Sequence, residues 1–146
     1  MSRIRVSTII DATPAEVWAA LEDVGSHVEW MADAEAIRFR TERRRGRGTG
    51  CECDARVGPL TLTDVMEITE WSPRKAMGVR HTGVVTGGGR FTLARARGGR
   101  TRFTWRERLR FPWWLGGSLG GVVGAEVLRL IWKGNLARLK GKVEQG

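Results

Sequence analysis

Apolar and polar residues alternate over residues 3–10, so that Ile4, Val6 and Ile10 fall on one side of an extended chain. A period of two is typical of a β-strand with one buried face. The alternation gives way to Thr13-Pro14-Ala15-Glu16, in which a capping hydroxyl precedes proline, and glutamate follows three residues after the threonine. This order predicts the start of a helix, because these residues satisfy or remove the unpaired amides of its first turn.

A second, shorter helix is expected directly afterwards. Ser26-His27-Val28-Glu29 follows Gly25 with the spacing of another capping box, and Trp30 and Met31 would supply the apolar side. We expect His27 to lie at the surface there rather than to act as a ligand, because polar residues at helix starts are mostly solvated.

From residue 35 to residue 111 the chain consists of successive strand patterns separated by turn signals. The expected strands cover 36–44, 49–57, 60–71, 76–86, 89–97 and 101–111. The breaks contain glycine or proline and lie at 46–50, 58–59, 72–73, 87–89 and 98–99. Connections this short join antiparallel neighbours, since a parallel partner needs a crossover of about a dozen residues or more.

After Pro112 the pattern changes to that of a long helix. Its apolar residues fall on one broad arc, which comprises Leu119, Val122, Val123, Val127, Leu130 and Ile131. A sheet with one apolar face and a single long apolar helix must cover each other. The sequence therefore predicts one α+β domain over 1–146. A curved antiparallel sheet of about seven strands surrounds the C-terminal helix, and two short helices follow the first strand.

Several local sequences resemble the START-like superfamily, also called SRPBCC or Bet v 1-like, which has the helix-grip fold. They are residues 10–18, Trp30-Met31, the glycine-rich turn 46–50, residues 70–74 and Trp105-Arg106-Glu107. More narrowly, the chain is similar to the polyketide cyclase/dehydratase and lipid-transport branch. The resemblance implies a mostly apolar cavity between sheet and terminal helix, which holds lipids or other hydrophobic molecules in some members and cyclises polyketides in others. These motifs are structural, so they indicate fold more directly than function.

Candidate chemistry comes from polar residues on strand faces that are otherwise apolar. In the last expected strand, Glu107 shares its face with Phe103 and Trp105, whereas the alternate positions are polar. A carboxylate buried alone is costly, so it must find a partner or take up a proton. Glu107 is therefore the first candidate for a site residue.

The same test selects one residue on each of two other strands. Asp64 lies in line with Met66, and His81 lies in line with Met77. Strand adjacency permits contact between them, and an imidazole beside a carboxylate in an apolar cavity would form a proton-transfer pair. The alternatives are a bulge that turns Asp64 outward, and a core His81 that bonds to a backbone carbonyl.

No catalytic role is assigned, and the candidates in an enzyme would be Glu107, His81 and Asp64. The expected ligand-binding residues are these three with Met66, Met77, Phe91, Phe103, Trp105, Trp30, Leu119 and Val123. The chain has no nucleophile elbow, phosphate loop, dinucleotide fingerprint or HExxH sequence, and no tyrosine to serve as a general acid. We expect neither a metal nor a cofactor.

Charge is unevenly distributed along the chain. The net charge is +9, but residues 1–73 hold 9 basic and 13 acidic side chains, whereas residues 74–146 hold 16 and 3. Such a field could attract an acidic partner, an anionic membrane or nucleic acid. Nucleic acid is the less favoured partner, because the arginines of the last strand and its aromatic residues fall on opposite faces.

The terminal helix also imitates a membrane span, with Trp113 and Trp114 at its start. Glu126 and Arg129 inside the span argue against insertion and are expected to form a surface ion pair. Peripheral contact through the two tryptophans stays an alternative. The first residues contain no long apolar stretch and Cys51 and Cys53 are expected to be reduced core residues, so the expected location is the cytoplasm.

Three functional hypotheses follow. The leading one is a carrier or sensor that binds a hydrophobic small molecule between sheet and helix. The second is a polyketide cyclase, aromatase or dehydratase that uses Glu107 or His81 for proton transfer. The third is an interaction module whose basic sheet face meets an acidic partner or an anionic membrane.

Overall fold

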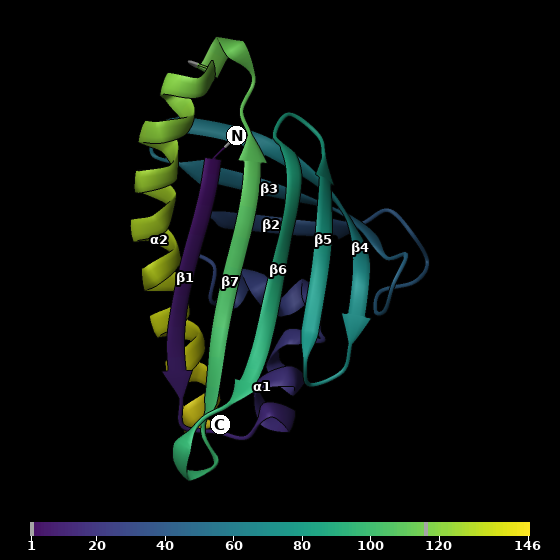
Figure 1. Ribbon diagram of the computed structural model, residues 1–146. Helices are drawn as coiled ribbons and strands as arrows, with labels where there is room; N and C mark the ends of the chain where they lie inside the picture. Colours follow the sequence, from purple (N-terminus) through teal and green to yellow (C-terminus); the bar gives the residue numbers. More distant parts are fainter. Residues whose placement is uncertain (1, 116) are drawn as a thin grey trace.

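One seven-stranded antiparallel sheet and a long C-terminal helix make up most of the chain (Figure 1). The computed structural model describes residues 2–115 and 117–146, with side chains described for 2–114 and 123–146. The elements follow the order β1 (Ser2–Ile10), α1 (Pro14–Leu21), η1 (Val24–Glu29), β2 (Ala34–Phe39), β3 (Gly50–Val57), β4 (Leu60–Ser72), β5 (Ala76–Thr82), β6 (Thr86–Arg95), η2 (Arg97–Gly99), β7 (Thr101–Arg110), η3 (Trp113–Leu115) and α2 (Gly117–Gln145).

The sheet is a meander closed by its first strand. Its order is β1-β7-β6-β5-β4-β3-β2, and every neighbouring pair is antiparallel. This confirms the predicted α+β helix-grip architecture. The pairing between β4 and β5 shifts register between Ile68 and Glu70, and such a bulge bends a strand. In Figure 1, β2 and β3 cross behind β6 and β7 at a steep angle, so the sheet presents a concave face.

Helix α1 begins as the sequence predicts. The Thr13 hydroxyl accepts a hydrogen bond from the Glu16 backbone amide at 3.3 Å, and Pro14 occupies the first turn. Val17, Trp18 and Leu21 are buried. The cap and the apolar face together fix this helix against the sheet.

The expected capping box at Gly25 is wrong. The second helix is a 3-10 helix that follows Asp23 without a side-chain cap, and Ser26 lies inside it, where its hydroxyl donates to the Asp23 carbonyl at 2.7 Å. His27 is also not at the surface, since only 5% of it is exposed. Burial is the main reason that the pKa of His27 is lowered to about 4, and Nε2 lies 2.8 Å from the Leu21 carbonyl oxygen.

The three consecutive glycines 87–89 lie within β6 and not in the preceding turn. The predicted strands 76–86 and 89–97 are observed as β5 (Ala76–Thr82) and β6 (Thr86–Arg95), so the turn comes earlier, at residues 83–85. Glycine is normally a turn signal. Here it removes side chains from a strand near the middle of the sheet.

Helix α2 packs along β1, but its buried face differs from the predicted arc. Val123 and Leu130, which were expected to be buried, are 60% and 70% exposed. Among residues 123–145, whose side chains the structure describes, the buried positions are Ala125, Trp132, Asn135, Leu136 and Leu139. Trp132 has the largest side chain of the helix, and Leu136 and Leu139 follow it one and two turns later. Burying these three side chains removes the most apolar surface from water, and this sets the rotation of the whole helix.

The other apolar pattern that the sequence offers is a membrane span. Within the described part of the chain, no helix is both long and apolar enough to cross a membrane.

Candidate functional site

Three strands bring Asp64, His81 and Glu107 together. His81 Nδ1 lies 2.9 Å from Asp64 Oδ2 and 3.1 Å from Oδ1, and His81 Nε2 lies 2.9 Å from Glu107 Oε2. His81 and Glu107 are buried, with 7% and 6% of their surface exposed, and 19% of the Asp64 side chain is exposed. The imidazole therefore lies between two carboxyl groups, one at each ring nitrogen.

The glycines of β6 make this contact possible. His81 on β5 pairs with Gly87, and Glu107 on β7 pairs with Gly89, so β6 lies between the two polar residues. Side chains on a middle strand would normally stand between residues of its two neighbours. Because Gly89 has no side chain, the space above the backbone of β6 is open to the Glu107 carboxyl group, which meets the imidazole there.

The geometry holds His81 in its protonated form. A carboxylate only accepts hydrogen bonds, so two carboxylates facing the two ring nitrogens require a hydrogen on each nitrogen. Burial by itself would lower the pKa of His81, but the hydrogen bonds to Asp64 and Glu107, and their charges, outweigh burial and raise the pKa to about 10. Glu107 accepts a second bond from Trp105 Nε1 at 3.1 Å.

Two cavities adjoin at this network. The first has a volume of about 130 Å³ and the second about 260 Å³. Both are lined by Asp33, Ala55, Asp64, His81, Glu107 and Trp132, which we call the junction. Beyond the junction the linings are mostly apolar, and the second cavity is lined by Leu62, Leu109, Phe111 and Leu128 among others. Together the cavities fall within the range of about 300–1,000 Å³ typical of small-molecule sites.

Asp33 is a junction residue that sequence reasoning missed. It accepts hydrogen bonds from Trp132 Nε1 at 3.1 Å and from Asn135 Nδ2 at 2.8 Å. It precedes β2, where no alternation points to it. The fully buried Asn135 inside an apolar helix face was the available signal, because a buried amide needs a polar partner.

The structure places the other expected ligand residues in three ways. Met66, Met77, Phe91 and Trp105 line the first cavity. Phe103 and Trp30 are buried in the core, 0% and 1% exposed, and pack against Phe91 without lining either cavity. Val123 is exposed and lines neither cavity, and the side chain of Leu119 lies outside the described residues.

Cys51 and Cys53 also line the first cavity and are free thiols. Burial, reinforced by the charge of Asp64, raises the pKa of Cys51 to about 11 and that of Cys53 to about 12. Both are therefore protonated and poor nucleophiles at neutral pH. Among the described residues, no group of three histidine, cysteine, aspartate or glutamate side chains is arranged to hold a metal ion.

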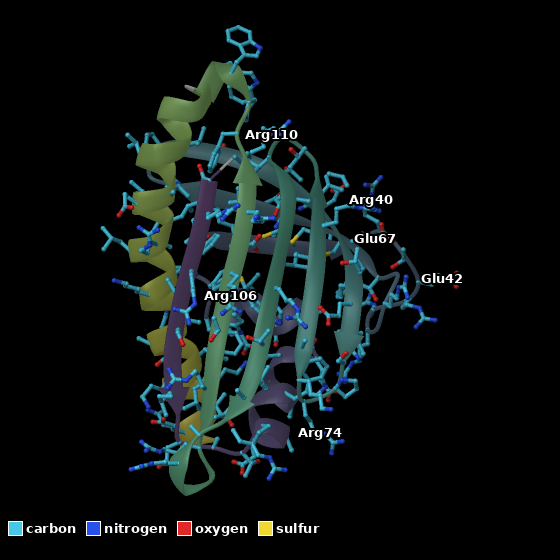
Figure 2. All side chains as sticks on the ribbon, in the orientation of Figure 1. Arg40, Glu42, Glu67, Arg74, Arg106 and Arg110 are labelled. Atoms are coloured by element: carbon cyan, nitrogen blue, oxygen red, sulfur yellow. The ribbon has the colours of Figure 1, made fainter. Side chains whose placement is uncertain are left out.

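The basic face of the sheet is turned away from the cavities. Exposed arginines alternate with the buried residues of β7, and Figure 2 labels two of them, Arg106 and Arg110, along this strand. Trp113 and Trp114 after β7 are 85% and 56% exposed, and Arg129 forms the predicted ion pair with Glu126.

Comparison with known proteins gives a family and a shared fold. Residues 1–144 match the family described as polyketide cyclase/dehydrase and lipid transport. No curated protein sequence matches the chain.

Three solved structures illustrate the shared fold. TTHA0849 from Thermus thermophilus has a TM-score of 0.83 at 16% identity, covering 97% of this chain and 96% of that one. A START superfamily protein from Mycobacterium smegmatis has a TM-score of 0.75 at 11% identity, covering 99% of both chains. The Zhui aromatase/cyclase from Streptomyces sp. R1128 has a TM-score of 0.72 at 17% identity, covering 98% and 93%. These likenesses establish the fold alone.

Proposed function

Because this chain belongs to the polyketide cyclase/dehydrase and lipid transport family, we propose that it binds a lipid- or polyketide-like small molecule between its sheet and helix α2, as a carrier or sensor. The observation that supports this most is the buried His81–Glu107 pair at the junction of two mostly apolar cavities. Replacing a buried ion pair by well-packed apolar side chains of similar volume often leaves a fold equally stable or makes it more stable, so stability alone does not explain this pair. Its position beside empty apolar space favours a role in ligand recognition.

Affinity would come chiefly from apolar burial. Removing apolar surface from water contributes about 25 cal/mol per Å², from which the cost of immobilising the ligand is subtracted. The polar groups of the junction would fix the orientation of the ligand, as the few polar groups of apolar binding sites generally do.

A cyclase, aromatase or dehydratase activity is the second candidate, and the protonation pattern of the junction favours it. The His81 imidazolium can donate a proton to a carbonyl or departing hydroxyl oxygen, and Asp64, the more exposed of its two partners, can accept one. The Zhui aromatase/cyclase has the same fold. With no tyrosine in the chain, acid catalysis in this cavity would depend on His81.

Native mass spectrometry of the purified chain tests the binding proposal. We expect an added mass of lipid or polyketide size, and saturable binding of the neutral dye Nile red. Leu62→Trp would fill the second cavity and abolish both signals. Thr61→Trp, on the exposed face of the same strand, is the matched control and would retain them. The proposal would be refuted if the purified chain carries no ligand and Leu62→Trp and Thr61→Trp bind Nile red equally well.

The same co-purified compound separates a carrier from an enzyme. A carrier returns its ligand with unchanged mass, whereas a dehydrating cyclase returns a product that has lost water. Glu107→Gln would abolish the mass change if proton transfer through His81 drives it.

A further inference from the structure

Negative charge is in excess where the two cavities meet. Asp33, Asp64 and Glu107 line both cavities, and His81 is the single basic residue among the described residues that do so. Arg90 lines the first cavity, but its guanidinium group binds the Glu70 carboxylate at 2.7 Å and 2.9 Å and is half exposed. The junction therefore contains three carboxyl groups and one imidazolium.

Each of the three carboxyl groups faces hydrogen-bond donors. Asp33 faces the Trp132 indole N–H and the Asn135 amide, Glu107 faces the Trp105 indole N–H, and His81 donates to Asp64 and Glu107. Hydrogen-bond donors stabilise a carboxylate. Three carboxylates against one imidazolium leave an excess of two negative charges inside an apolar enclosure, where charges interact more strongly than in water.

We infer that the molecule bound in these cavities is a cationic amphiphile, whose amine or ammonium group lies at the junction and whose hydrocarbon fills the apolar space beyond it. This inference rests on the proposed function. A positive group at the junction offsets the excess charge, and Asp64, with 19% of its side chain exposed against 6% for Glu107, is the more open of the two carboxyl groups that bind His81. A carboxylate or phosphate headgroup would be repelled there.

The shape of the cavities suits such a molecule. The larger, second cavity extends from the junction past Leu62 and Leu109 to Phe111, so a hydrocarbon chain attached to the positive group has an apolar path. The first cavity, lined by Phe91 and Trp105, accepts a smaller apolar substituent on the other side of the charge.

Three matched ligands test the inference on the full chain: decylammonium, decanol and decanoate, titrated below their micelle concentrations and followed by tryptophan fluorescence. The expected order is decylammonium at least about ten-fold tighter than decanol, and decanoate weakest. Asp64→Asn would weaken decylammonium binding about ten-fold and leave decanol unchanged. Asp54→Asn on the neighbouring strand removes a solvent-accessible carboxylate bound to Arg38 and would leave the order unchanged.

The possible results separate a failure of this inference from a failure of the proposed function. Equal affinity for the three ligands, tighter binding of decanoate, or an unchanged preference in Asp64→Asn would overturn the inference and leave the binding proposal standing. If none of the ligands binds, the proposed function falls and the inference falls with it. If Asp64→Asn does not fold by circular dichroism, the order of the three ligands on the wild-type chain decides alone.

Discussion

The Glu107 carboxyl group lies over the backbone of Gly89, in the space that any side chain at position 89 would need. A Cβ atom built on Gly89 would stand 2.2 Å from Glu107 Cδ and from each carboxyl oxygen, closer than non-bonded atoms approach. The two residues are direct partners in the β6–β7 pair. Glycine at position 89 is thus a condition for the hydrogen bond between Glu107 and His81.

Gly89→Ala should therefore displace the Glu107 carboxyl group and weaken its bonds to His81 and Trp105. We expect the free energy of unfolding to fall by about 1–3 kcal/mol, from overpacking and from buried polar groups left without partners. Denaturant unfolding measures it. Gly50→Ala is the control, because its new Cβ would come no closer than 3.4 Å to another atom. Equal stability of the two variants would contradict this account.

The chain has only two histidines, and at neutral pH they should carry different charges. With a pKa of about 10, His81 stays protonated at pH 8, whereas His27, with a pKa of about 4, stays neutral at pH 5.5. The ¹⁵N shifts of the two imidazole rings report each state directly. In Glu107→Gln the pKa of His81 should fall, since one of its two carboxylate partners is gone. A His81 that titrates near pH 6.5 would show that the carboxylates do not hold its proton.

These two histidines should affect stability in opposite pH ranges. The pKa of His81 is raised above 6.5 by folding, so its contribution is complete below pH 6.5 and is lost as the pH rises through about 10. The pKa of His27 is lowered, so its contribution is complete above pH 6.5 and is lost as the pH falls through about 4. His81→Gln should flatten the alkaline loss in a series of denaturant melts, and His27→Gln the acid loss. An alkaline loss that His27→Gln removes, or an acid loss that His81→Gln removes, would contradict these two pKa shifts.

Asp33→Ala should lower the free energy of unfolding by about 1–3 kcal/mol, because it removes the acceptor of both Trp132 Nε1 and Asn135 Nδ2. Asn135 is fully buried, so water does not replace the lost partner easily. Thermal unfolding, with Asp11→Ala at an exposed position as the control, measures the difference. A loss no larger than that of the control would mean that these hydrogen bonds do not stabilise α2.

Strand alternation predicted the inward position of Glu107, because a period of two assigns faces even when strand ends are uncertain. The same rule placed Asp64 and His81 in line with cavity residues, and the local cap at Thr13 predicted the start of α1. The meander followed from short connections, and the resemblance to the family is confirmed by the match over residues 1–144. Each of these features is encoded by near neighbours in the chain.

The contact between His81 and Glu107 could not be predicted in this way. It depends on two strands that are not neighbours and on glycines that, as a local pattern, indicate a turn. The rotation of α2 was missed for a related reason. Val123 and Leu130 match the apolar pattern of a buried face, but the helix has one rotation, and the packing of Trp132 against Trp105, with ring centroids 4.2 Å apart, decides it.

The seven tryptophans allow the most direct test of the central claim, that a hydrophobic ligand enters the space between sheet and helix. Trp105 and Trp132 line the first cavity, whereas Trp113 and Trp114 are exposed after β7. In ¹H–¹⁵N spectra of the indole groups during a decanol titration, the account predicts saturable shifts of Trp105 and Trp132 with Trp113 and Trp114 unmoved. Shifts confined to Trp113 and Trp114, or no saturable shift at all, would contradict it.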